Sequence, residues 1–219
     1  MPHPQRAARI AGGLYLLTVV TSIPALALKA PVLSDPASAA GGSAALTWAA
    51  LLEVVLAAAC VGTAVVLYPV VRRQGETAAL GFVVARTLES GLVLSGVIAM
   101  LALARVTGAA APGLVAIHDG AFLIGPGLIP AANALCLGYL LYRSRLVPRV
   151  IPLVGLVGAP LLIASAIASL FGVTGQVSAV AGVAALPIAL WEISLGLWLV
   201  VKGFRAEPLA TLMAGRVAA

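Results

Sequence analysis

Six long apolar runs, each close to the length that spans a lipid bilayer, dominate this chain. A membrane-spanning helix needs about 20 mainly apolar residues. The chain is therefore predicted to be all-α, a polytopic membrane helix bundle with six transmembrane helices. The six predicted helices are Ile10–Leu28, Ser43–Val71, Ala78–Ala104, Val115–Tyr142, Val150–Phe171 and Ser178–Val201.

The composition supports a membrane protein and argues against a soluble one. The 219 residues are 62% hydrophobic and only 9% charged, whereas a soluble domain is about 45–50% apolar and about 25% charged. No hydrophilic stretch is long enough for a second domain. Residues 1–219 are therefore predicted to form a single transmembrane domain.

The basic residues predict the orientation. The net charge of +6 does not indicate nucleic-acid binding, because most basic residues lie at the termini or in short loops. Positively charged loops face the cytoplasm, so both termini are predicted to be cytoplasmic. The predicted cytoplasmic basic residues are Arg6, Arg9, Arg72, Arg73, Arg143, Arg145, Arg149, Lys202, Arg205 and Arg216, against only Lys29 and Arg105 in the external loops.

Several ionisable side chains fall inside the predicted helices. A charge at the bilayer centre is unfavourable by about 2.5–3.5 kcal/mol, so such groups face the bundle interior or a wet cavity. Counting residues from each helix end predicts that four lie in the middle third of the bilayer at similar heights, and that a histidine and an aspartate lie in the outer half. These groups are Glu53, Arg86, Glu89 and Glu192, followed by His118 and Asp119.

The charges of this set do not balance. Arg86 and Glu89 are three residues apart, share a helix face and are predicted to form an ion pair. One interpretation is that this pair has no role other than fixing the packing of the helices. One guanidinium cannot neutralise all the carboxylates, and His118 is expected either to pair with Asp119 as a cation or to accept a hydrogen bond from it. Burial and repulsion between like charges favour the neutral acid, so at least one of Glu53 and Glu192 is predicted to be protonated at neutral pH.

The fourth predicted helix contains the segment Gly125-Pro126-Gly127, followed by Pro130. Each proline removes a backbone hydrogen bond and clashes with the preceding turn. We expect the helix to break there, as in helices that line binding sites; a plain proline kink is the alternative. Asn133 follows Asp119 by fourteen residues, so an unbroken helix would place both on one face.

Metal and cofactor motifs are missing from the sequence. Cys60 and Cys136 lie in apolar runs without the Cys-x-x-Cys or Cys/His spacing of a zinc site. Both are expected to be small, buried, apolar side chains. Neither a P-loop nor a GxGxxG segment occurs. We therefore expect no metal and no cofactor.

Several segments in combination resemble a known family. They are Arg9-Ile-Ala-Gly-Gly-Leu-Tyr-Leu-Leu, Arg86-x-x-Glu89, His118-Asp119-Gly-Ala-Phe-Leu-Ile-Gly-Pro126, Gly138-Tyr-Leu-Leu-Tyr-Arg-Ser-Arg-Leu-Val-Pro148, and Trp191-Glu192 followed by Gly196-Leu-Trp-Leu-Val-Val-Lys-Gly-Phe-Arg205. The chain is similar to a bacterial family of multi-pass membrane proteins catalogued as a domain of unknown function. The resemblance implies a multi-pass protein of the bacterial inner membrane and implies no activity. Glu53 belongs to none of the matching segments.

Three classes of function fit these observations. A metal-independent enzyme of isomerase or cyclase type, acting on a lipidic small molecule, would use Glu53 or Glu192 as general acid and His118–Asp119 as base. A proton-coupled carrier would use Glu89 and Glu192 as a relay and the fourth helix as a gate. In a structural or regulatory subunit the polar groups would only specify helix packing.

The candidate ligand-binding residues are Arg86, Glu89, Pro126 and Asn133. Membrane lipid is the expected partner, a homo-oligomer is compatible with the sequence, and nucleic acid is not expected.

Overall fold

The structure is a computed structural model that describes residues 4–35, 43–106 and 108–214. These residues form helices joined by short connections, without a strand. The helices are α1 (Pro4–Ser34), α2 (Ser43–Val71), α3 (Glu76–Leu103), the short 3₁₀ helix η2 (Gly108–Ala110), α4 (Ala111–Ser144), α5 (Val150–Leu170), α6 (Ala179–Val201) and α7 (Ala206–Ala214). Six of them are long and apolar enough to cross a membrane, which confirms the predicted all-α bundle with six spans.

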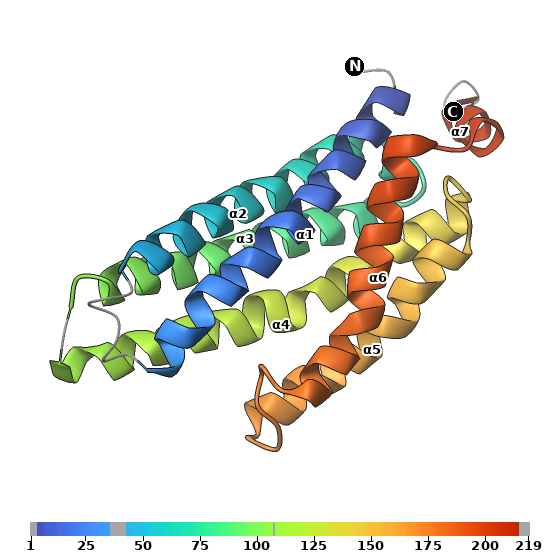
Figure 1. Cartoon of the computed structure of the whole chain (residues 1–219). Coiled ribbons are helices and arrows are strands. Elements are labelled where there is room, and N and C mark those ends of the chain that lie inside the picture. The colour runs from blue at the N-terminus through green and yellow to red at the C-terminus, as the bar shows by residue number, and fades with distance from the viewer. Residues whose placement is uncertain (1–3, 36–42, 107, 215–219) are drawn as a thin grey trace.

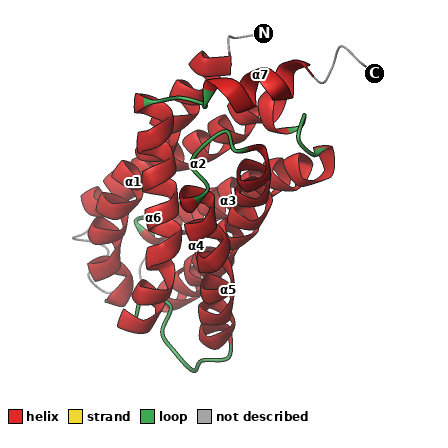
Figure 2. Ribbon diagram, turned by 90° about the vertical axis from the view of Figure 1, so that its right-hand side faces the viewer, coloured by secondary structure: helices red, strands yellow, loops and turns green. Residues whose placement is uncertain are grey.

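The six long helices pack in a closed ring in which each helix contacts its neighbours along the chain. Helix α1 closes the ring by packing on α6 as well as α2. The beginning of α1 and the end of α6 lie at the same end of the bundle, next to α7 (Figures 1 and 2). We call this end the terminal face, and the opposite end, where α1 ends and α4 begins, the distal face. An even number of spans requires this arrangement.

Glycine allows the closest helix contacts in the ring. A Cβ added at Gly12 in α1 would lie 2.7 Å from the backbone of Gly196 in α6. A Cβ added at Gly155 in α5 would lie 2.7 Å from the indole of Trp191, which is fully buried. Small residues let membrane helices approach closely without a hydrophobic driving force. These contacts hold α6 between α1 and α5.

Helix α4 is continuous from Ala111 to Ser144, so the predicted break at Gly125-Pro126-Gly127 is wrong. Pro126 and Pro130 lie inside the helix, and each fixes φ near a helical value while removing one donor. Packing supports the segment, because a Cβ at Gly125 would lie 2.8 Å from the Cβ of Leu92 in α3. Membrane helices tolerate prolines where neighbouring protein surrounds the freed backbone groups.

Helix α1 is longer than predicted. Its predicted end was Leu28, but the helix continues to Ser34 through Pro24 and Pro31. Lys29 is therefore part of the helix, and it is only 2% exposed. The prediction that Lys29 lies in an external loop is wrong, because the helix does not end where the apolar run ends and the lysine finds buried partners.

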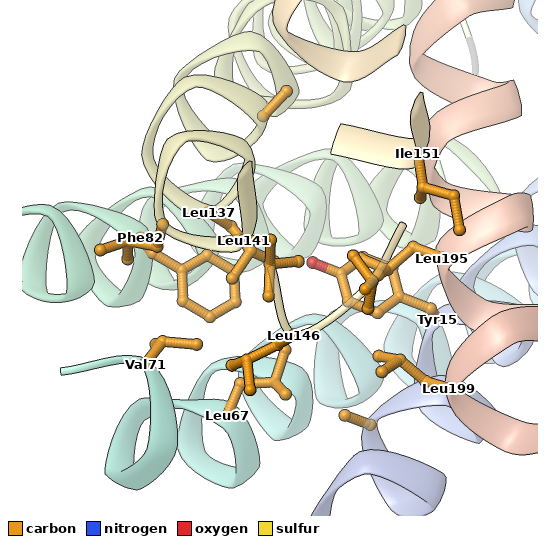
Figure 3. Packing of buried hydrophobic residues seen from close by; sticks show 14 of the residues in the cluster. Tyr15, Leu67, Val71, Phe82, Leu137, Leu141, Leu146, Ile151, Leu195 and Leu199 are labelled. Atoms are coloured by element: carbon orange, nitrogen blue, oxygen red, sulfur yellow. The ribbon is translucent and has the colours of Figure 1, made fainter. Parts of the chain in front are cut away.

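Two apolar cores lie at different levels of the bundle. The larger one, which we call the terminal core, contains Tyr15, Leu67, Phe82, Leu137, Leu141, Leu195 and Leu199, all with less than 2% exposure. Figure 3 shows these side chains pointing toward one another from α1, α2, α3, α4 and α6. The smaller one, the distal core, contains Val32, Leu46, Val97, Met100 and Leu103. The buried charged residues lie between these two cores.

Candidate functional site

Arg86 is the centre of the first polar cluster. Its Nη1 lies 3.0 Å from Oε2 of Glu89, one turn later in α3, and its Nη2 lies 2.6 Å from Oε1 of Glu192 in α6. The exposed fractions of the three side chains are 1%, 9% and 15%. The Arg86–Glu89 pair predicted from the spacing is present, and Glu192, which had no partner in the sequence, shares the same guanidinium.

Three neutral side chains complete this cluster. Asn133 in α4, with its amide oxygen toward the guanidinium, accepts from Nη2 at 3.0 Å and from Nε at 3.1 Å. The ring of Tyr15 in α1 lies 4.8 Å from the guanidinium carbon, within cation–π range. Cys60 in α2 lies 3.5 Å from Nη1. Arg86 therefore joins five helices. We call these six residues the Arg86 cluster.

Lys29 is the centre of a second cluster, nearer the distal face. Its Nζ forms a buried ion pair with Glu53 in α2 and lies 3.1 Å from Nε2 of His118 in α4. The other ring nitrogen, Nδ1, lies 3.0 Å from Oδ1 of Asp119. The ring of Phe122 lies 4.7 Å from the lysine Nζ. We call these five residues the Lys29 cluster.

Lys29 is the one charged residue of the two clusters that was not among the predicted site residues. Hydropathy ended the first helix one residue before it, so the lysine was counted with the loop charges. The helical spacing contained the signal. The buried positions Tyr15, Thr18, Thr21 and Ala25 follow one another at steps of three or four residues, and the next such step reaches Lys29.

The predicted site residues form two clusters and not one. Glu53 and Cys60 are seven residues apart in α2, which puts the Lys29 cluster about 10 Å further along the helix axis than the Arg86 cluster. The prediction that Glu53 lies level with Arg86 is therefore wrong. Asp119 and Asn133 likewise belong to different clusters, because the fourteen residues between them correspond to about 21 Å of helix.

The two clusters have similar charge counts. Each contains one fixed cation and two carboxylates: Arg86 with Glu89 and Glu192, and Lys29 with Glu53 and Asp119. His118 can contribute a second positive charge to the Lys29 cluster, and the aspartate side chain there is 46% exposed. The Arg86 cluster has no such group among the described residues, so the surplus negative charge is least compensated there.

A row of cavities begins at the Lys29 cluster. The first, of about 660 Å³, lies among the distal end of α1, α4 and the loop between α5 and α6, and its lining includes Lys29, His118 and Asp119. The second, of about 230 Å³, shares Leu26 and Phe122 with it. The third, of about 250 Å³, contains Arg86, Glu89 and Glu192 in its wall.

Pro126 lies where these spaces meet. It lines the second and third cavities, and also a gap of about 10 Å³ beside Lys29 and Glu53. Sequence analysis singled out this proline as part of a binding site because of an expected helix break. Its position beside both clusters fits that role, although the helix is unbroken.

The comparison with protein families decides the family. The model of the domain of unknown function DUF4386 matches residues 10–203. The chain belongs to the DUF4386 family. No curated protein and no solved structure matches the chain. All residues of both clusters fall within the segment that the DUF4386 model matches, whereas α7 lies beyond it.

The described part of this DUF4386 protein contains no group of three or more histidine, cysteine, aspartate or glutamate side chains that could hold a metal ion. Cys60 and Cys136 are both free thiols. The two clusters contain carboxylates, a histidine, a lysine and an arginine.

Proposed function

We propose that this DUF4386 protein is a single-domain, multi-pass protein of the bacterial inner membrane, with cytoplasmic termini, that binds a lipidic small molecule and moves protons on it. The observation that supports this best is the cavity of about 660 Å³ with Lys29, His118 and Asp119 in its wall. Ligand pockets are commonly about 300–1,000 Å³, mainly apolar, with few polar groups.

The cavity lining favours an amphipathic ligand. Leu26, Leu33, Phe122 and Val177 supply apolar wall, and the charged groups and the histidine of the lining belong to the Lys29 cluster. Two carboxylates there face one lysine, so an anionic head group is disfavoured. We therefore expect a neutral or cationic head group, such as a hydroxyl, carbonyl or amine, at the end of an apolar body.

A proposed base, His118–Asp119, and a proposed acid, Glu192, lie at opposite ends of the row of cavities. A ligand with its head group beside His118 and Asp119 would extend through the second cavity toward Glu192 in the third. His118–Asp119 is then the base and Glu192 the acid, while Arg86, Glu89 and Asn133 hold Glu192 in place. An isomerisation or cyclisation removes a proton from one atom and returns one to another, so it needs no metal, cofactor or second substrate.

Access to the cavities supports an enzyme or binding protein over a carrier. The three cavities form a row from the distal face, and none shares a lining residue with the pocket at the terminal face. The terminal core, in which Tyr15, Leu137 and Leu195 are fully buried, lies on the terminal side of the Arg86 cluster, and Figure 3 shows its side chains packed against one another. A carrier needs a path to both sides.

Ligand binding can be tested with a photoactivatable long-chain alcohol carrying a diazirine. After irradiation in lipid nanodiscs, mass spectrometry of peptides should find the label near Leu26 and Phe122. Ala27→Trp narrows the cavity and should reduce this labelling several-fold. Ala58→Trp is the matched control, because Ala58 is an exposed alanine on α2. Labelling that spreads evenly over lipid-facing helices and ignores Ala27→Trp would contradict the proposal.

The proton chemistry has a separate test. In D₂O the wild-type protein should introduce deuterium into a carbon-bound position of a component of a bacterial lipid extract, detected by mass spectrometry. His118→Asn and Glu192→Gln should abolish this incorporation while keeping the label near Phe122. If deuterium enters no lipid, or enters equally with both variants, the acid/base assignment is refuted and binding alone is left.

A further inference from the structure

The terminal face contains a strongly basic pocket that the proposed function does not use. Its volume is about 730 Å³, and it lies between the α2–α3 turn, the α4–α5 turn and the beginning of α7. Arginines from three separate segments converge on it: Arg72, Arg73, Arg143, Arg145 and Arg205. The pocket wall contains one carboxylate, Glu207. We call it the terminal pocket.

The guanidinium groups of the terminal pocket are poorly compensated. Within the described residues, none of the five arginines forms a salt bridge. The Nε atoms of Arg72 and Arg73 are buried and have no hydrogen-bond partner. A buried donor without a partner is unfavourable. The arginines that line the pocket therefore lack an anionic partner among the described residues.

Arg145 adds an independent observation. It is the only described non-glycine residue with positive φ, at 56°. It follows the end of α4, where its N–H donates to the carbonyl of Leu141 at 3.1 Å. Glycine is the usual residue at this position, because a side chain in the left-handed region is strained. An arginine held in a strained conformation beside a pocket is a pattern typical of functional sites.

The orientation rule for membrane proteins explains only part of this pattern. It requires arginines in cytoplasmic loops, but it does not require them to converge. Arg149, in the same α4–α5 connection, does not line the pocket; it lies over the ring of Tyr142, with its guanidinium carbon 4.9 Å from the ring centre.

We propose that the terminal pocket binds the phosphate group of an anionic ligand. Guanidinium groups match phosphate oxygens with paired, charge-assisted hydrogen bonds, and basic pockets between membrane helices on the cytoplasmic side bind anionic head groups. Tyr68 and Tyr139 lie beside Arg72 and Arg143, as in the aromatic belts at membrane surfaces. A phospholipid head group and a soluble phosphate ester have this chemistry in common.

The test compares ligands and variants in nanodiscs of phosphatidylcholine. Thermal unfolding is followed with phosphatidylglycerol added to the bilayer in one arm and with glycerol 3-phosphate added to the buffer in the other. The wild type should be stabilised in at least one arm, and that arm identifies the source of the phosphate. Arg72→Gln/Arg73→Gln should weaken the apparent binding at least about tenfold, as expected for lost bonds to a charged group.

Arg149→Gln is the matched control, because it removes the same charge from the same face but outside the pocket. It should bind like the wild type. Arg205→Gln is a second pocket variant with an exposed side chain, for use if the double variant unfolds without ligand. The proposal is overturned if neither ligand stabilises the wild type, or if Arg149→Gln weakens binding as much as the pocket variants do.

Discussion

Replacing Lys29 with methionine tests whether the Lys29–Glu53 pair organises the distal half of the bundle. The two side chains are 2% and 8% exposed, so the change leaves a carboxylate buried without its cation. Breaking a buried ion pair by removing one partner is destabilising by about 3–5 kcal/mol. Methionine keeps the length and apolar stem of lysine, so little of the loss should come from packing.

A similar loss of stability for Lys29→Met follows from the free energy of protonating Glu53. The unpaired carboxyl can avoid a buried charge by taking up a proton. An ordinary glutamate ionises near pH 4.3, so protonating it at pH 7 requires about 2.7 units at about 1.36 kcal/mol each, or about 3.7 kcal/mol. The variant then binds one proton more when folded than when unfolded. Its stability loss should therefore shrink by about 1.4 kcal/mol for each pH unit between 7 and 5.

The assay is unfolding of the purified protein in a mild detergent, followed by circular dichroism at pH 7 and pH 5. Lys29→Met should lose about 3–5 kcal/mol at pH 7 and less at pH 5. Lys29→Met/Glu53→Gln should recover most of the loss, because no buried charge is left. Lys202→Met, at an exposed lysine after α6, should change little. If Lys29→Met is neutral at pH 7, the pair does not organise the bundle and the reasoning fails.

Two further predictions concern α3, α5 and α6. Gly155→Ala places a Cβ 2.7 Å from the Trp191 indole and should destabilise the protein by about 1–3 kcal/mol. The control is Gly91→Ala, whose added Cβ has nothing within 4 Å; it should be neutral or stabilise the protein by up to about 1 kcal/mol. Equal effects of the two variants in the same unfolding assay would contradict the close α5–α6 contact. Infrared spectra at pH 7 should show a protonated carboxylic acid that the double variant Glu89→Gln/Glu192→Gln removes, because the single guanidinium of Arg86 faces both carboxylates; a spectrum with every carboxyl ionised would refute this.

The Arg86 cluster shows how far sequence spacing alone can predict a membrane site. Two partners three residues apart on one helix must share a face, so the Arg86–Glu89 pair followed from the sequence. Glu192 and Asn133 were recognised as intramembrane polar groups. That both share Arg86 as a partner was not predicted, because this depends on how α4 and α6 are rotated about their own axes. A helix in an alanine-rich chain has no strong apolar stripe to fix that rotation.

The sequence determined the six apolar runs, their all-α character and the even number of spans, because a bilayer accepts only segments of sufficient length and apolarity. Only the tertiary structure decided the pairing of Lys29 with Glu53 and His118. Hydropathy treats a lysine at the end of an apolar run as the end of the helix, whereas a buried partner on another helix makes the continued helix favourable. The same packing kept α4 continuous through Pro126, and it separated the ionisable groups into two clusters at different depths.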